Sequence, residues 1–121
     1  MKFLLDTNII IGLLDGQHEA RDALTRDHIV PAETAISQIT RMEVLAHPAM
    51  TTATELIARA FMNKLLVLML DDAVEADAIR IRRQSRLKLP DAIIAATSRV
   101  HGLKLVTLDS TLASKIAALP A

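Results

Sequence analysis

Short aliphatic runs alternate with longer segments of helical periodicity along the whole chain, and this alternation limits the fold more than any other feature. The continuous apolar run at residues 3–5 suits a strand buried on both faces. Residues 34–37, 65–70 and 103–107 are the other predicted strands. Helical patterns occupy residues 9–14, 18–26, 38–46, 52–63, 72–86, 90–101 and 110–118. Strands that alternate with helices predict a mostly parallel sheet covered on both faces. We therefore expect one three-layer α/β/α domain over residues 1–121, with roughly four to five strands.

Residues with capping chemistry mark several helix boundaries. Thr52 and Glu55 have the spacing of a capping box, which predicts that a helix begins there. Asp72 and Glu75 repeat that spacing at a second boundary. Pro90 suits the first turn of a third helix, because its missing N–H group has no partner there in any case.

The composition excludes several classes of site. Without cysteine, the chain has no disulfide, no thiolate zinc site and no cysteine nucleophile. Phe3 and Phe61 are the only aromatic residues, which argues against base stacking on an aromatic platform. Fourteen acidic and fourteen basic residues give zero net charge, which argues against a broadly basic surface. No apolar run approaches the ~20 residues of a membrane span, so we expect a cytoplasmic protein without membrane contact.

Most acidic residues lie in polar or capping contexts. Asp71, Asp72, Glu75 and Asp77 cluster near one predicted helix start, where the helix dipole favours negative charge, and we expect them to be solvated. Four other acids adjoin apolar segments: Asp6, Glu43, Asp91 and Asp109.

Each of these four acids has an ordinary structural explanation. Asp6 and Asp109 directly follow predicted strands, where either could simply cap the next helix. Asp91 opens an almost wholly apolar helix and could cap it too. Glu43 shares a helix face with apolar residues, where it could pair with Arg41 or lie on an exposed face.

Taken together, the four acids point to one place. Three of them fall at strand ends or helix starts, on the side where open α/β sheets build their sites, and Glu43 can reach that side from the helix after the second strand. Carboxylates within ~5 Å of one another repel, so protons or cations must compensate them. Mg²⁺ or Mn²⁺ suits such oxygen ligands, and an acidic cluster with bound metal suits phosphodiester hydrolysis.

Four sequence blocks carry a resemblance to a known family. They are FLLDTNII at residues 3–10, ISQITRMEV at 36–44, LPDAIIAA at 89–96 and LVTLD at 105–109. In this order and spacing the chain resembles PIN-domain ribonucleases, and among them the VapC-type toxins of bacterial toxin–antitoxin pairs. The resemblance implies a small PIN-like α/β/α domain.

The resemblance also assigns roles to individual residues. The family's acidic, metal-binding and catalytic positions correspond to Asp6, Glu43, Asp91 and Asp109. Thr107 matches the threonine that supports the last acid, and Thr7 and Asn8 match the residues that orient the first. Many relatives carry a further acid three residues after the position of Asp109. Leu112 stands there in this chain, which leaves four acids to hold one or two ions.

The resemblance implies endonucleolytic cleavage of RNA with water as nucleophile and Mg²⁺ or Mn²⁺ as cofactor. It further implies a homodimer held inactive by a cognate antitoxin. Candidate RNA contacts form the only dense basic run of the chain, with Arg41 and Arg99 outside it: Arg80, Arg82, Arg83, Arg86 and Lys88. The alternative is that this run is a solvated helix face.

Two other functions remain open at this point. A phosphatase with Asp6 as nucleophile would also place an aspartate after the first strand, but such enzymes need a second aspartate where Asn8 stands. A non-enzymatic binding module could keep the fold without the activity. The presence of all four acids argues against this module.

Overall fold

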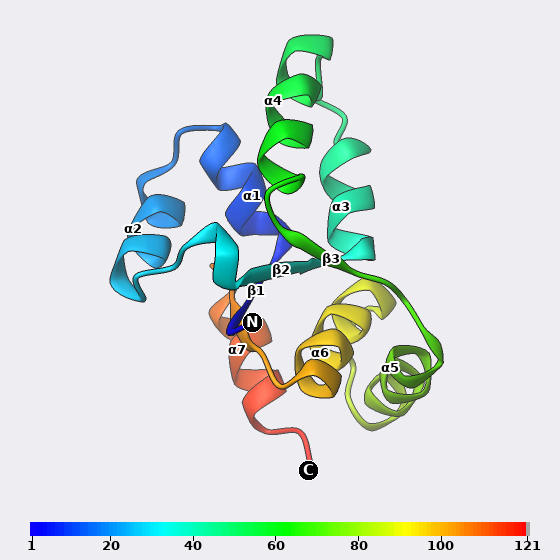
Figure 1. Cartoon of the computed structure of the whole chain (residues 1–121). Coiled ribbons are helices and arrows are strands. Elements are labelled where there is room, and N and C mark those ends of the chain that lie inside the picture. The colour runs from blue at the N-terminus through cyan, green and yellow to red at the C-terminus, as the bar shows by residue number, and fades with distance from the viewer. Residues whose placement is uncertain (121) are drawn as a thin grey trace.

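The computed structural model describes residues 1–120 as one layered α/β domain (Figure 1). Its strands are β1 (Phe3–Leu5), β2 (Thr34–Ser37), β3 (Leu66–Leu68) and β4 (Lys104–Val106). Its helices are α1 (Thr7–Leu14), α2 (His18–Arg26), the 3₁₀ turn η1 (Pro31–Glu33), α3 (Gln38–Leu45), α4 (Thr52–Met62), α5 (Asp72–Gln84), α6 (Leu89–His101) and α7 (Ser110–Ala117). None of these helices is both long and apolar enough to cross a lipid bilayer.

The four strands form one parallel sheet in the order β3-β2-β1-β4. This confirms the predicted parallel sheet, at the lower of the two expected strand counts. Phe3 lies opposite both Thr34 and Lys104, and Leu5 lies opposite Val106, so β1 and β4 end side by side. β2 and β3 are added to the sheet on one side of β1, and β4 is added on the other side. The strand order therefore reverses between β1 and β4, which is where open α/β sheets place their ligand sites.

Successive residues of the central strands β1 and β2 point to opposite faces of the sheet and pack into two separate hydrophobic cores. Leu5 and Ile36 face a cluster built with α1, α2, α3 and α4, whereas Leu4 and Ala35 face α6 and the residues around it. Figure 1 shows α1, α3 and α4 on one side of the sheet and α5, α6 and α7 on the other. The alternation of side chains along a strand thus gives the expected three layers, with helices on both faces.

Helix caps move several predicted boundaries by one or two residues. Asp6 caps α1 through its contact with the Thr7 N–H, so this helix begins two residues earlier than its apolar pattern indicated. The predicted capping box at Thr52 is wrong by one position, because Thr51 accepts the N–H of Thr54 at 3.1 Å. Asp71 caps α5 in the same way. Thr51 and Asp71 each stand three residues before the N–H that they accept, as N-caps commonly do.

Candidate active site

Asp6 is the buried carboxylate at the carboxyl end of β1. Its residue is 5% exposed. Its Oδ1 accepts the Thr7 N–H at 2.8 Å, and its Oδ2 accepts the Thr107 hydroxyl at 2.7 Å and the Asn8 side-chain amide at 3.2 Å. Both carboxylate oxygens are thus held in fixed directions. Asp6 caps a helix and also occupies the predicted site, so the two interpretations of this residue hold together.

Thr107 joins the ends of β1 and β4. Its hydroxyl donates to Asp6 and accepts from the Asn8 side-chain amide at 3.1 Å and from the Asp109 N–H at 3.0 Å. The Asn8 carbonyl oxygen in turn accepts the Leu108 N–H at 3.1 Å. One hydroxyl therefore orients the first acid and also fixes the backbone that carries the last one.

Glu43 reaches this network from α3. Its Oε1 accepts the Thr7 hydroxyl at 2.8 Å, and the buried Thr40 hydroxyl lies 3.2 Å from the same Thr7 oxygen. Glu43 therefore forms no ion pair with Arg41 in the described chain. Thr40 belongs to the network although the sequence did not single it out. The available signal was its position three residues before Glu43, which places both on one helix face.

Asp91 and Asp109 occupy different positions at helix starts. Asp109 is the N-cap of α7, where its Oδ1 accepts the Leu112 N–H at 3.0 Å. Asp91 lies within the first turn of α6, whose N-cap is Lys88, so the capping explanation for Asp91 is wrong. Within residues 1–120 the Asp91 side chain has no hydrogen-bond or ion-pair partner. Its half-buried carboxylate is thus available for a ligand.

The acids act on one another electrostatically. Burial raises the pKa of Asp6, the bonds from Thr107 and Thr7 oppose that rise, and the charges of Glu43 and Asp109 add to it. Burial also raises the pKa of Asp91, and the charges of Asp6 and Asp109 raise it further, against Lys88 and Lys115. The four carboxylates therefore share one electrostatic environment at the edge where β1 and β4 end.

These raised pKa values predict a pH-dependent stability. A carboxyl whose folded pKa is raised stabilises the fold fully below its unfolded pKa of 3.8, and loses that contribution as the pH rises through the folded value. Asparagine mimics the neutral acid. In metal-free protein, Asp91→Asn should therefore melt with wild type near pH 4 and above wild type at pH 7. Calorimetry across this range checks the prediction, and a constant difference at all pH values would contradict it.

The divalent ion that the resemblance implies requires hard oxygen ligands. Among residues 1–120, no three acidic or histidine side chains are grouped closely enough to hold an ion by themselves. Mg²⁺ does not need such a cage, since it keeps several waters and binds proteins through one or two carboxylates. Asp91 has no protein partner, and the remaining acids supply further hard oxygen atoms. The donor set therefore fits a hydrated Mg²⁺ or Mn²⁺.

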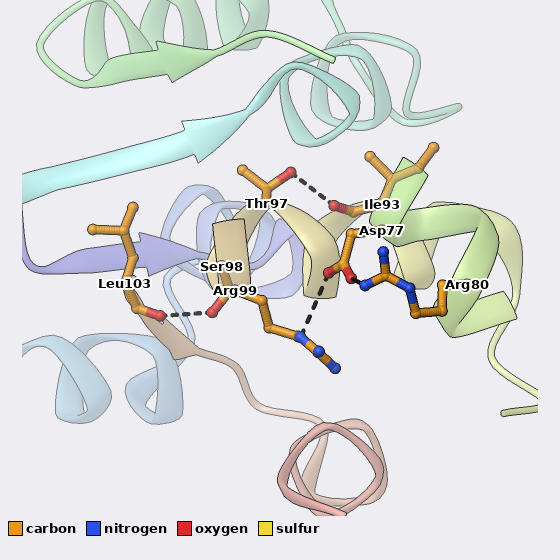
Figure 2. A network of polar contacts seen from close by, with 7 residues as sticks. All are labelled: Asp77, Arg80, Ile93, Thr97, Ser98, Arg99 and Leu103. Carbon is orange, nitrogen blue, oxygen red and sulfur yellow. Dashed lines mark hydrogen bonds and ion pairs between the residues drawn. The ribbon is translucent and has the colours of Figure 1, made fainter. Parts of the chain in front are cut away.

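Asp77 corrects one expectation, because its side chain is only 8% exposed rather than solvated. Its Oδ1 accepts Nη1 of Arg80 at 2.6 Å, and Nε of Arg99, from α6, lies 3.5 Å from its Oδ2 (Figure 2). Two of the candidate RNA contacts are thus engaged with Asp77: Arg80 within α5, and Arg99 across from α6. The helical pattern could not reveal the pair with Arg99, since the two residues are far apart in the sequence.

Removing both arginines should destabilise the fold more than removing either. Asp77 is buried, whereas each arginine is at least partly exposed. Removal of both arginines would therefore leave a buried carboxylate without an ion-pair partner, which lowers the free energy of unfolding. The Arg80→Gln/Arg99→Gln double variant should lose about 2–3 kcal/mol of unfolding free energy. Arg82→Gln/Arg83→Gln, with the same charge change on exposed residues, should lose under about 0.5 kcal/mol. Urea titration measures both, and equal losses would contradict the role of Asp77.

The other candidate RNA contacts are free of protein partners in the described chain. Arg82, Arg83, Arg86 and Lys88 are exposed, and Arg41 on α3 is half-buried. None of them forms an ion pair within residues 1–120. They therefore remain available to an anionic partner, unlike Arg80 and Arg99.

Comparisons with known proteins agree with this architecture. The family model described as "PIN domain" matches residues 3–118. A solved toxin–antitoxin complex from Klebsiella pneumoniae contains a chain that is 34% identical, with a TM-score of 0.82 and coverage of 98% of this chain and 93% of that chain. A DNA-bound VapBC from Salmonella typhimurium gives 25% identity and a TM-score of 0.67, over 85% of this chain and 83% of that one.

A third structure, FitAcB from Neisseria gonorrhoeae, is similar in fold at 23% identity, with a TM-score of 0.76 over 95% of this chain and 93% of that one. Comparison with curated protein sequences found no match. The family model nonetheless spans nearly the whole chain, including all four acids and Thr107. The chain therefore belongs to the PIN domain family, as its four sequence blocks predicted.

Proposed function

We propose that this protein is a metal-dependent endoribonuclease and the toxin of a toxin–antitoxin pair. The observation that carries the proposal is the shared environment of Asp6, Glu43, Asp91 and Asp109 at the reversal point of the sheet. Four carboxylates from β1, α3, α6 and α7 repel one another there, and a bound cation would offset that repulsion. The similarity to a chain of the Klebsiella pneumoniae toxin–antitoxin complex supports the biological role.

Asp6, Asp91 and Asp109 would hold the ion directly or through its waters. When bound, Mg²⁺ or Mn²⁺ supplies Lewis acidity toward water and charge neutralisation at the phosphate. Thr107 and Asn8 hold Oδ2 of Asp6, the Thr7 N–H holds its Oδ1, and the Thr7 hydroxyl fixes one oxygen of Glu43. The second oxygen of Glu43 can then orient the attacking water. The water would lose a proton and form a bond to phosphorus while the P–O3′ bond breaks, and the 3′-oxygen would take up a proton from solvent and leave as a hydroxyl group.

Leu112 limits the number of ions that the chain itself can hold. It replaces the further acid of many relatives, and its side chain is buried at 3% exposure in the core below α7. The α7 position that could contribute a fifth carboxylate thus contributes to packing instead. We propose one tightly held ion, with a second held mainly by the substrate.

We also propose two protein partners. The similar structures are described as toxin–antitoxin complexes, so a cognate antitoxin is the expected inhibitor, and a homodimer follows from the same resemblance. Exposed apolar side chains are available on the surface, among them Leu56 and Ile57 of α4 at 67% and 62% exposure. Patches of this kind commonly mark protein interfaces.

Metal removal provides the direct test of the function. Purified protein should cut single-stranded RNA in Mg²⁺ or Mn²⁺, lose activity completely in excess chelator and regain it when the ion is restored. Sequencing the cleaved ends should show 3′-hydroxyl groups on the upstream fragments. Cleavage that persists in chelator, or a metal-supplemented protein that never cuts RNA, would refute the proposal.

The phosphatase alternative has less support. A nucleophilic aspartate must present a free oxygen to phosphorus, yet both oxygens of Asp6 accept hydrogen bonds and its residue is 5% exposed. Asn8, where a second acid would be needed, donates to Asp6 instead. Failure to trap an acyl phosphate on Asp6 with a phosphomonoester would separate the two mechanisms.

A further inference from the structure

Three basic residues lie on or just before the helices α6 and α7, whose starts include Asp91 and Asp109. Lys88 is the N-cap of α6, three residues before Asp91. Lys115 is on α7, whose N-cap is Asp109. Arg86 belongs to the short connection between α5 and α6. Lys88 thus lies at the helix start that carries Asp91, whereas Lys115 lies in the last turn of the helix that Asp109 caps.

Arg86 and Lys115 also line one hollow. It has a volume of about 430 Å³ and lies between the end of α5 and the last turns of α7, with Gln84 and Leu119 in its wall. Ser85 shapes this wall, because its hydroxyl donates to the Ile81 carbonyl at 2.7 Å and accepts the Leu87 N–H at 3.3 Å. The connection that carries Arg86 is therefore held by its own hydrogen bonds.

These three cations lack acidic partners in residues 1–120. Arg80 and Arg99 neutralise Asp77, whereas Arg86, Lys88 and Lys115 are exposed and form no ion pair there. Lys88 precedes Asp91 by three residues at the start of α6, and Lys115 lies on the helix that Asp109 caps. Lys115 follows Asp109 by six residues, which is about 9 Å along α7. The hollow therefore suits backbone phosphates beside one that lies over the acids.

We propose that Arg86, Lys88 and Lys115 form a subsite that binds backbone phosphates of RNA next to the scissile one. This inference rests on the proposed nuclease function. In it, the RNA strand lies over the α5–α6 connection and the end of α7. The subsite reads phosphates rather than bases, because its side chains are cations without aromatic neighbours. It also divides the basic run: Arg86 and Lys88 bind RNA, while Arg82 and Arg83 do not.

Binding of RNA without cleavage provides the first test. The probe is a short fluorescein-labelled single-stranded RNA, and fluorescence anisotropy is followed in chelator over a series of salt concentrations. Arg86→Gln/Lys115→Gln should weaken binding about tenfold and reduce the slope of log affinity against log salt by about 1.4, at about 0.7 for each lost phosphate contact. Arg82→Gln/Arg83→Gln should change the affinity less than about twofold.

A second double variant matches the charge change at the opposite edge of the sheet. Lys64 precedes β3, and Arg26 adjoins Asp27, which pairs with the first residue of β4. Arg26→Gln/Lys64→Gln therefore removes two exposed cations from the amino edge, away from the acids, and should leave RNA affinity within about twofold of wild type. Equal weakening by all three double variants would show a diffuse charge effect and overturn the subsite.

Kinetics separate this inference from the nuclease proposal. In Mg²⁺, Arg86→Gln/Lys115→Gln should raise KM about tenfold with little change in kcat, since the lost contacts are to non-reacting phosphates. A protein that binds RNA through these residues but never cuts it would retain the subsite and lose the nuclease. A protein that cuts RNA with unchanged KM in this variant would lose the subsite and retain the nuclease.

Selectivity for phosphates is the last arm of the test. Fluorescein-labelled polyglutamate carries carboxylates instead of phosphodiesters, so it reports whether the hollow simply attracts anions. Wild type should bind it at least about tenfold more weakly than RNA at equal salt. Equal affinity, lost equally in Arg86→Gln/Lys115→Gln, would indicate a site for an acidic protein segment and overturn the RNA assignment.

Discussion

Replacing Asp91 by asparagine is expected to lower the RNA-cleavage rate by about 10²–10³-fold without disturbing the fold. Asp91 is the cleanest of the four acids to change, because its side chain has no hydrogen-bond or ion-pair partner within residues 1–120. Asparagine keeps the shape and removes the charge that would hold the ion. The loss should appear in kcat/KM at saturating Mg²⁺ and shrink partly at higher Mn²⁺ concentration.

Asp72→Asn is the matched control for this change. Asp72 is also an aspartate in the first turn of a helix, α5, but it is exposed and lies outside the acid cluster. Its substitution should leave cleavage within about twofold of wild type. Far-UV circular dichroism should be the same for both variants and wild type. A fully active Asp91→Asn protein would remove Asp91 from the proposed site, and with it the central support for metal-assisted hydrolysis.

The layered fold was predictable because local and long-range signals agree. Continuous aliphatic runs such as residues 3–5 have no polar face, so they belong in a sheet covered on both sides. The strand ends were less predictable. Leu66 to Leu68 and Lys104 to Val106 pair over fewer residues than their apolar runs, because pairing depends on the neighbouring strand's register rather than on hydrophobicity.

The site was predictable as a set of acids but not as a network. Asp6 and Asp109 follow strands that end at the same edge, which parallel topology guarantees. The buried pairing of Asp77 with Arg99, and the approach of Lys115 to Asp91, join residues from different helices. Such contacts depend on how the helices pack, and a single sequence carries no pattern for them.

The same site sets stability against function. Burial and neighbouring charges raise the pKa values of Asp6 and Asp91, so the ionised acids that would bind a cation destabilise the metal-free fold. Hydrogen bonds from Thr107 and Thr7 hold Asp6 against that tendency. Repulsion between the ionised acids would thus persist until a cation binds. The residues that hold the acids in place should therefore be as important to activity as the acids themselves.

Thr107→Val is accordingly expected to lower cleavage about a hundredfold although Thr107 carries no charge. Valine keeps the shape of threonine but removes the donor to Asp6 and the acceptor for the Asn8 amide and the Asp109 N–H. Unmet polar groups of this kind cost about 1–3 kcal/mol of unfolding free energy. Because the lost bond lowers the pKa of Asp6, the acid limb of the pH–rate profile should move to higher pH.

Two further variants distinguish positioning from packing. Thr107→Ser restores the hydroxyl and should recover most of the activity and the position of the acid limb. Thr97→Val removes another buried threonine hydroxyl, which donates at 2.7 Å to the Ile93 carbonyl of its own helix (Figure 2). That carbonyl lies inside a continuous helix, so Thr97→Val should lose little stability and no activity. If Thr107→Val instead lost stability while kcat and the pH profile stayed unchanged, the Thr107 hydroxyl would be structural only, and the hydrogen bond to Asp6 would have no part in orienting the acid for catalysis.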